Sequence, residues 1–366
     1  MKRTADTVVI GAGVIGLVIA TALAKRGLSV ILAGEPRSGE ASTAAAGMLA
    51  PSVERASGPA HDFTIAARNM YPDYLEHLAD ATGIRVPLNR LGILQVAITE
   101  RGVSGLARTR SVESSWLDRS QLASLEPALG HALGAVLNPG DGAVDNVILM
   151  KALWELVERT PSISRVTGAV TAVAQMPSIG VATLSTGEKL EGAALVLAPG
   201  AWGGLIDGAP ALSAVRPSRG QLISYEPIGL RHVTYGPRGY LVPRASGTTI
   251  AGSTMENAGF ISETTSHGLA KVQAAAEEIA PALSIAKVTA QWAGLRPVTP
   301  DMLPIIGRDP ANPRIIYACG HSRNGILMAP LTGETVASIV SDEPVPYDLS
   351  QFRPERFHDR FPRTHE

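Results

Sequence analysis

The sequence has little of several features that would narrow its function at once. A single cysteine, Cys319, excludes an internal disulfide framework and is typical of proteins from a reducing compartment. Basic and acidic residues nearly balance, with a formal net charge of −1, which indicates neither a nucleic-acid-binding face nor a polybasic membrane-binding run. The eight histidines are scattered and form no cluster with ligand spacing, so we expect no metal site.

Long apolar runs are also missing. No uncharged apolar segment reaches the roughly 18 residues that a membrane-spanning helix needs, so we expect no membrane span. Met1-Lys2-Arg3 precedes an apolar segment, as in a signal peptide, but residues 8–10 are too short for its hydrophobic region. We therefore interpret this segment as the first strand of a cytoplasmic protein. The 366 residues, 45% hydrophobic and 18% charged, suit a globular enzyme of two domains.

Three glycines near the N-terminus carry the most specific local signal. Gly11, Gly13 and Gly16 have the G-x-G-x-x-G spacing between an expected strand (8–10) and an expected helix (17–25). In dinucleotide-binding folds the first glycine permits a tight turn, the second lets the backbone approach a pyrophosphate, and the third lets helix and strand pack closely. The phosphates then lie at the positive helix N-terminus. This context predicts a dinucleotide site, with a purely structural turn as the alternative.

The acidic partner of this fingerprint is displaced. An acid about 20 positions after the glycines normally ends the second strand and binds the ribose hydroxyls. Here Gly34 holds the expected position and Glu35 follows it. Glu35 either reaches the ribose from a shifted strand end or is a solvated loop charge.

The remaining periodicity predicts an α/β protein in which a second domain interrupts the first. Apolar spacing predicts helices over 62–82, 147–158, 267–279 and from about Thr332 to Val340. Apolar runs bounded by Gly and Pro predict strands over 91–98, 165–174, 195–198, 216–225, 239–242, 248–252 and 314–318. The strands within 216–252 do not alternate with helices, which favours antiparallel pairing.

Four stretches together resemble the flavin-dependent amino acid and amine oxidases of the D-amino-acid oxidase family. They are AAAGML (44–49), YLVPR (240–244), WAGLRP (292–297) and GHSRNGILMAP (320–330). The similarity extends to about Val340, and within the family it is greatest to the glycine oxidases of thiamine biosynthesis. In the last stretch a strand leads into a helix, whose N-terminus can stabilise negative charge on a reduced flavin.

The resemblance implies non-covalent FAD and two domains. A Rossmann-like FAD-binding domain would comprise residues 1–50, 140–215 and 290–345. An α+β substrate domain with a mainly antiparallel sheet would comprise 51–139 and 216–289, and 346–366 would be a peripheral tail. The R-x-x-R-G-Q run of 216–221 would lie near the boundary. The residues expected to bind FAD are Gly11, Gly13, Val14, Ile15, Gly16, Glu35, Thr43, Ala44, Ala45, Ala46, Gly47, Met48, Val170, Gly200, Trp202, His321, Arg323, Asn324, Gly325, Ile326 and Leu327.

Two further positions, Asn146 and Cys319, raise questions when the sequence is compared with the family. Asn146 stands where many relatives have proline, and we expect this difference to change only a loop. Cys319 raises the question of a covalent flavin, as in sarcosine oxidases, but free cysteine usually behaves as a small hydrophobe. We expect an inert buried thiol.

Arg296, Tyr240 and Arg323 are the candidate catalytic residues. The planar guanidinium of Arg296 can hold an α-carboxylate through two parallel hydrogen bonds, as the matching arginine does in relatives. Tyr240 can donate its hydroxyl to the same carboxylate. Arg323 either reaches the substrate or only braces the flavin loop.

Met48, Met255 and Glu54 match residues at the small substrate pocket of relatives. Each of the three also has a purely structural interpretation, since methionine is an ordinary core residue and Glu54 could lie at an exposed helix start.

These residues predict FAD-dependent oxidative deamination of glycine or another small amino acid. With the carboxylate held, hydride can pass from the α-carbon to flavin N5 without a general base. The imine would hydrolyse to a 2-oxo acid and ammonia, and molecular oxygen would reoxidise the flavin to give hydrogen peroxide. The alternatives are an oxidase or dehydrogenase of D-amino acids or sarcosine-type secondary amines, and a non-catalytic nucleotide-binding protein. We also expect a homo-oligomer, either a dimer or a tetramer.

Overall fold

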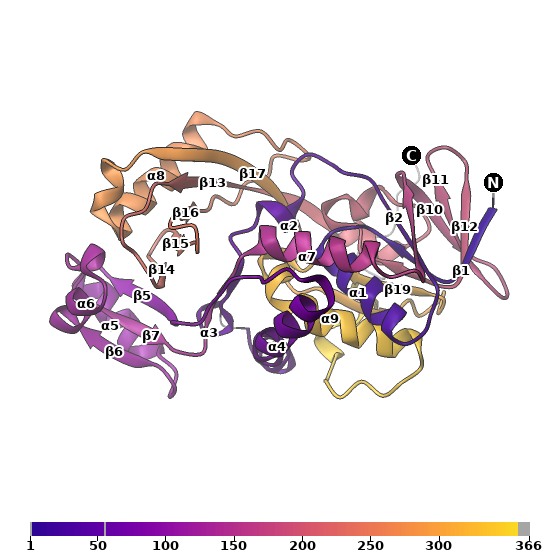
Figure 1. The fold of residues 1–366 in the computed structure, drawn as a ribbon, viewed down its shortest axis with the longest axis horizontal. Coiled ribbons are helices and arrows are strands. Elements are labelled where there is room, and N and C mark those ends of the chain that lie inside the picture. The colour runs from indigo at the N-terminus through magenta and orange to yellow at the C-terminus, as the bar shows by residue number, and fades with distance from the viewer. Residues whose placement is uncertain (1, 55, 358–366) are drawn as a thin grey trace.

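The first of two large sheets is organised around β1 (Lys2–Ile10). The computed structural model describes residues 2–54 and 56–357 and forms two lobes, each containing an eight-stranded sheet (Figure 1). β1 pairs in parallel with β2 (Val30–Gly34) and β12 (Lys189–Leu197), and its apolar residues Val8 and Val9 are fully buried, as in sheets covered on both faces.

The order of this first sheet is β10-β11-β12-β1-β2-β9, and β19 also joins β12 in parallel. The strand predicted over 165–174 is in fact two strands with a turn between them. The other strands are β9 (Ile163–Thr167), β10 (Val170–Gln175), β11 (Gly180–Leu184), β18 (Ile305–Arg308) and β19 (Ile315–Cys319).

Four helices share one apolar core against this sheet. They are α1 (Val14–Lys25), α4 (Pro59–Thr82), α7 (Asn146–Glu158) and α9 (Gly325–Val340). α9 lies so close to α1 that a Cβ on Gly333 would come within 3.0 Å of the Val18 carbonyl oxygen. α4 lies in the range expected for the substrate domain, yet it buries Phe63 and Tyr71 in this core.

α9 begins seven residues before the predicted start because it accommodates Pro330. Proline inside a helix leaves the carbonyl four residues earlier without its donor, which usually ends a helix. Here the Tyr71 hydroxyl of α4 donates to the Ile326 carbonyl oxygen, the group that Pro330 cannot satisfy. This donor lies 255 residues away in the sequence, so no local pattern reveals it.

The second large sheet has the order β17-β13-β16-β15-β14-β5-β7-β6. Every pairing is antiparallel except that of β14 with β5. β17 spans the expected domain boundary at residue 290 and pairs with β13 over ten positions. The strands are β5 (Ile93–Ala97), β6 (Ser115–Asp118), β7 (Gly134–Asn138), β13 (Arg216–Tyr225), β14 (Val233–Tyr235), β15 (Tyr240–Pro243), β16 (Thr249–Gly252) and β17 (Val288–Val298).

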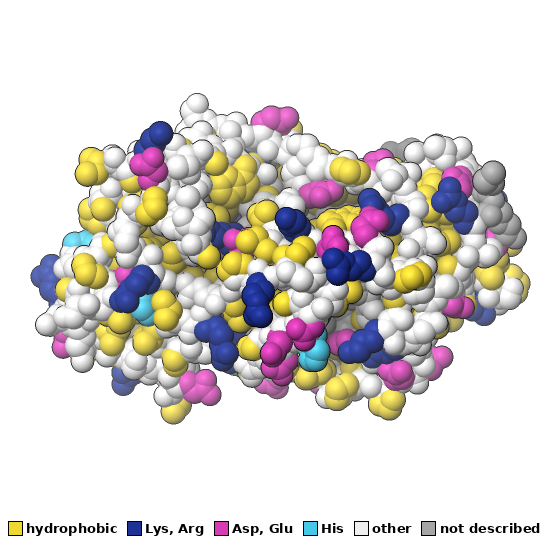
Figure 2. Space-filling view, viewed as in Figure 1, with side chains coloured by type: hydrophobic (Ala, Val, Ile, Leu, Met, Phe, Trp, Pro, Cys, Tyr) yellow, Lys and Arg dark blue, Asp and Glu magenta, His cyan; other side chains and the backbone are white. Residues whose placement is uncertain are grey.

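Helices and a small sheet complete the two lobes. A three-stranded sheet has the order β3-β8-β4. On the face drawn in Figure 2, basic and acidic side chains are intermixed, in keeping with the balanced composition. Among the described residues, none of the helices combines the length and the apolar character needed to cross a membrane. The remaining elements are α2 (Ala41–Ala44), α3 (Pro51–Glu54), α5 (Glu100–Thr109), α6 (Arg119–Leu125), α8 (Ser266–Ile279), β3 (Met48–Leu49), β4 (Leu88–Asn89) and β8 (Gly142–Val144).

Asn146 does more than alter a loop, so that expectation is wrong. It is the fully buried first residue of α7. Its Nδ2 donates to the carbonyl oxygens of Ser42 (2.8 Å) and Thr43 (3.1 Å), and its Oδ1 accepts from Nη2 of Arg244 (2.6 Å). Asn146 therefore ties the α2 segment of the first lobe to Arg244, the residue that follows β15 in the second lobe, which a proline side chain cannot do.

The Tyr71 contact yields a test of stability. Tyr71→Phe leaves the buried Ile326 carbonyl without a donor, so we expect the free energy of unfolding to fall by about 1–3 kcal/mol. Chemical denaturation measures it, with Tyr74→Phe on the same helix as the control, since the described residues give that hydroxyl no hydrogen-bond partner. Equal losses in the two variants would contradict this account of Pro330.

Candidate active site

A cavity of about 470 Å³ lies where the two lobes meet, and both contribute to its walls. From the first lobe come the α1 N-terminus, residues 33–35 after β2, residues 168–170 and the segment after β19. From the second come residues of β13, β15 and β17 and the loop after β16. One cavity thus joins the glycine fingerprint to the strands that carry the candidate catalytic residues.

The three fingerprint glycines have different local roles. A Cβ on Gly11 (φ 107°) would lie 2.1 Å from the Ala198 carbonyl oxygen, and one on Gly16 would lie 1.8 Å from the Gly11 oxygen. A Cβ on Gly13 would meet only Oγ of Ser42, at 3.1 Å. Gly11 and Gly16 therefore permit backbone packing, whereas Gly13 leaves the helix N-terminus open to a ligand, as a pyrophosphate requires.

A second helix N-terminus faces the same cavity. β19 ends at Cys319, the chain turns at Gly320 (φ 72°), and α9 begins at Gly325, with Gly325 and Ile326 in the cavity wall. Two helix N-termini therefore direct their partial positive charge into one space, which suits a ligand with phosphates and an electron-rich ring.

His321 lies at this second turn as a neutral side chain. It is 2% exposed, its Nε2 lies 3.2 Å from Oγ1 of Thr332, and burial lowers its pKa to about 3. Burial also raises the pKa of the neighbouring Cys319 thiol to about 12, so that thiol remains protonated and a poor nucleophile.

The cavity wall also includes other residues that were expected to bind FAD. Glu35 follows β2 directly and forms an ion pair with Arg37 (Nη2 to Oε1, 2.8 Å), and Arg37 lies 5.2 Å from the Trp202 ring centroid. A Cβ on Gly34 would lie 3.0 Å from that of Ala12, a close approach that favours glycine at the position where the acid is expected. Val170 and Gly200 line the same wall.

Arg296 reaches the cavity by lying across the neighbouring strand. A Cβ on Gly220 of β13 would be 2.0 Å from Nη1 of Arg296, so a side chain there would displace this guanidinium from its position. Nη2 donates to Oγ of Ser253 (2.5 Å) and Nη1 donates to the Thr254 carbonyl (3.1 Å). Both acceptors are uncharged, so within the described residues Arg296 has no ion-pair partner.

Tyr240 and Tyr235 form an aromatic wall on β15 and β14. The Tyr240 hydroxyl lies over Gly252, where a Cβ would be only 2.5 Å away. The Tyr235 ring lies 6.1 Å from that of Tyr240, and burial, with the nearby Glu54 charge, raises the pKa of Tyr235 to about 12. Tyr235 was not predicted from the sequence, although the short hairpin before Tyr240 could have indicated it.

Arg323, unlike Arg296, has a carboxylate partner. Its Nε forms an ion pair with Oε2 of Glu54, whose side chain is 7% exposed whereas that of Arg323 is 49% exposed. Burial raises the pKa of Glu54 even though Arg323 and Arg296 both favour its charged form. Glu54 therefore lies close to both arginines but pairs with Arg323.

The cavity wall does not include every residue that was predicted to bind FAD or substrate. Among the described residues, its wall includes Met48 and Met255, the latter 57% exposed, but not Gly16, Thr43, Asn324 or Leu327. Thr43 instead lines a separate surface pocket with Trp292, and Leu327 belongs to the core. The roles of Gly220, Ser253 and Thr254 were not predicted from the sequence, because no motif connects these residues to Arg296.

Comparison with known proteins gives the family. The model of the "FAD dependent oxidoreductase" (DAO) family matches residues 6–339. The chain is 32% identical to the glycine oxidase of Bacillus licheniformis, over 97% of this chain and 98% of that one. It is 34% identical to the bifunctional protein ThiO/ThiG of Synechocystis, over 98% of this chain, but spans only about half (55%) of that relative's length.

A solved structure agrees with this match. The glycine oxidase of Geobacillus kaustophilus superimposes with a TM-score of 0.89 at 30% identity, over 96% of this chain and 98% of that one. The protein is therefore an oxidoreductase of the FAD-dependent class. It belongs to the D-amino-acid oxidase family, and the predicted fold, the FAD cofactor and the class of FAD-dependent amino acid oxidase are confirmed.

The buried His321 predicts a specific loss of stability in acid. Because its pKa falls from 6.5 in the unfolded chain to about 3 in the folded protein, only the unfolded chain binds this proton between those values. Stability should therefore decrease as the pH falls below 6.5, by about 1.4 kcal/mol per pH unit from this group. Urea unfolding at pH 7 and pH 5 should show a smaller acid loss for His321→Gln, and identical losses would refute the assignment.

Proposed function

We propose that this protein catalyses the oxidative deamination of glycine or another small amino acid, in the formation of the thiamine thiazole. The observation that carries the proposal is how the four arginines of the cavity wall are paired. Arg37 pairs with Glu35, and Arg238 pairs with Glu278. Arg323 is paired with Glu54, whereas Arg296 is held by the uncharged Ser253 and Thr254 and keeps its charge available. A cation of this kind beside a cofactor suits a substrate with one carboxylate.

Arg296 would orient the substrate. A guanidinium offers two parallel donors, so a carboxylate bound to it has a fixed direction as well as a fixed place. Tyr240 lines the same cavity and would add its hydroxyl as a third donor. We propose that Arg323 braces the loop before α9 through Glu54 and does not contact the substrate.

The cavity residues would also limit substrate size. Tyr235, Tyr240, Met48 and Met255 place bulky side chains around the approach to Arg296. Such walls favour a short side chain on the α-carbon and exclude part of the water.

Bound FAD would accept the hydride from the α-carbon and pass the electrons to molecular oxygen, giving hydrogen peroxide. Gly11, Gly13 and Val14 would hold its pyrophosphate, Glu35 its ribose, and Gly325 and Ile326 the ring end. The chain's own part is to hold the substrate carboxylate, and the released imine would hydrolyse to a 2-oxo acid and ammonia. That molecular oxygen is the electron acceptor and that the protein forms a homo-oligomer remain predictions.

Purified holoenzyme should bleach when glycine is added without oxygen, and should form peroxide in air. A panel of glycine, sarcosine and D-alanine separates the substrate alternatives. A yellow protein that no amine bleaches would refute the proposal and favour a non-catalytic nucleotide-binding protein.

Arg296→Ala should lower kcat/KM for glycine by roughly 30- to 5,000-fold, which corresponds to about 2–5 kcal/mol for one member of a desolvated charge pair. Arg165→Ala, which removes an arginine on the Trp154 ring away from the cavity, is the control and should change it little. Full activity of Arg296→Ala would exclude the carboxylate role.

A further inference from the structure

The strand beside β13 contains one extra residue next to the guanidinium of Arg296. Leu222 of β13 pairs with Gly252 of β16, and Arg219 then pairs with Glu256 through two backbone hydrogen bonds of 2.9 Å. Three steps along β13 therefore correspond to four along 252–256. Residues 253–255 form a β-bulge, a device that changes the direction of side chains and is frequent beside active sites.

This bulge supplies both contacts that hold Arg296. Ser253 offers its hydroxyl and Thr254 its carbonyl to the two terminal nitrogens of the guanidinium. The Thr254 side chain is fixed from β13, because the Gln221 backbone N–H donates to its Oγ1 at 3.0 Å. The direction of the guanidinium thus depends on where the bulge lies.

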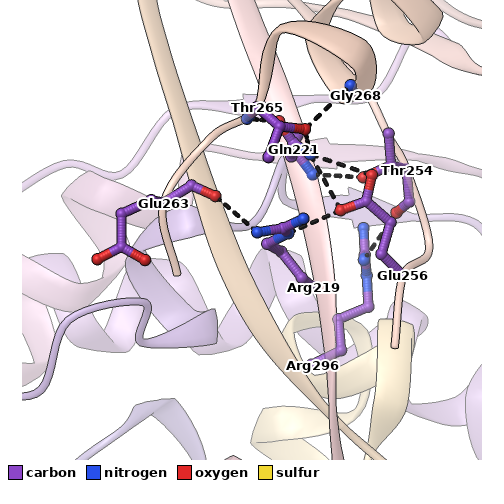
Figure 3. Close-up of polar contacts among 8 residues, drawn as sticks. All are labelled: Arg219, Gln221, Thr254, Glu256, Glu263, Thr265, Gly268 and Arg296. Carbon is purple, nitrogen blue, oxygen red and sulfur yellow. Dashed lines mark hydrogen bonds and ion pairs between the residues drawn. The ribbon is translucent and has the colours of Figure 1, made fainter. Parts of the chain in front are cut away.

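A second set of contacts fixes the far end of the bulge at Glu256 (Figure 3). Oε2 of Glu256 accepts from Nε of Arg219 (2.7 Å), and both its carboxylate oxygens lie 3.0 Å from Nε2 of Gln221. Arg219 and Gln221 are buried. Burial alone would raise the pKa of Glu256, but the hydrogen bonds from Gln221 and Arg219 outweigh it and lower the pKa.

The same cluster is attached to the start of α8. Arg219 Nη1 donates to the Glu263 carbonyl (3.0 Å), and the Thr265 N–H donates to Oε1 of Gln221 (2.7 Å). Thr265 in turn caps α8 by accepting from the Gly268 N–H (3.1 Å). The bulge is therefore braced against a helix.

None of the three network side chains belongs to the cavity wall. Among the described residues, that wall contains Gly220, Ser253, Thr254, Met255 and Arg296, but not Arg219, Gln221 or Glu256. Gly220 lies between Arg219 and Gln221, and alternate residues of a strand face opposite sides. The network lies behind the strand that Arg296 crosses.

We propose that Glu256 is a positioning residue, which, with Arg219 and Gln221, fixes the bulge at 253–255 and so sets the direction in which Arg296 presents its guanidinium to the substrate carboxylate. The proposal rests on the carboxylate-binding role proposed for Arg296. It assigns to Glu256 no contact with substrate or cofactor.

The test measures the dissociation constant of acetate from the FAD-bound protein, followed by the change in the flavin absorption spectrum. We expect Glu256→Ala to raise this constant about ten-fold, in the range of couplings between groups that share one network. Glu263→Ala is the matched control, because only the Glu263 backbone carbonyl takes part and its carboxylate points away from the network (Figure 3). It should leave the constant unchanged.

A double-mutant cycle shows whether the effect passes through Arg296. In the Arg296→Lys background, where the two-pronged contact is absent, adding Glu256→Ala should change the acetate constant less than two-fold. An undiminished ten-fold effect in that background would overturn the proposal, and so would equal acetate binding by Glu256→Ala and Glu263→Ala.

Failure of the proposed function gives a different result. If Arg296→Ala, which removes the charge altogether, binds acetate as tightly as the parent, Arg296 does not hold the carboxylate and the role proposed for it in the function is refuted. If Glu256→Ala does not retain FAD, Glu256→Gln takes its place, with the same expected rise and the same contradicting outcome.

Discussion

The site depends on two helix N-termini that open into one cavity. α1 and α9 come from opposite ends of the chain, and the bare backbone of Gly333 lets them pack in close contact at Val18. β1 and β19 both pair in parallel with β12, so the turns that follow them meet at the same edge of the sheet. FAD, with charged phosphates and a ring that becomes electron-rich, matches such an edge.

The second lobe contributes Arg296, which forms no ion pair with a carboxylate in the part of the chain that the structure describes. Arg219 and Arg323 each pair with a glutamate: the Arg323–Glu54 pair lies in the cavity wall, and the Arg219–Glu256 pair lies behind it. Arg296 has no ion-pair partner among the described residues; its guanidinium donates to a hydroxyl and a carbonyl, while the nearby Glu54 pairs with Arg323. In the proposed function, this local pairing of the other arginines leaves Arg296 as the cation presented to a carboxylate, and the bulge at 253–255 supplies the two acceptors that direct its guanidinium.

Local signals predicted a large part of this arrangement. The three glycines and the G-H-x-R-N-G stretch each describe a strand, a turn and a helix, so the family, the fold and the cofactor could be inferred from the sequence. The full length of α9 could not be predicted, because the partner of the Ile326 carbonyl is Tyr71 on α4. The buried role of Asn146 and the contacts of Arg296 with Ser253 and Thr254 were missed for the same reason, since each joins segments that are remote in sequence.

The position of α9 has a consequence for how the protein is made. A chain growing from its N-terminus carries the glycine fingerprint early, but the strand and helix that complete the cavity follow only after residue 314. Contacts of such large sequence separation form late in folding. FAD can therefore meet its whole binding cavity only in chains whose synthesis has passed α9, and by mass action it stabilises those chains.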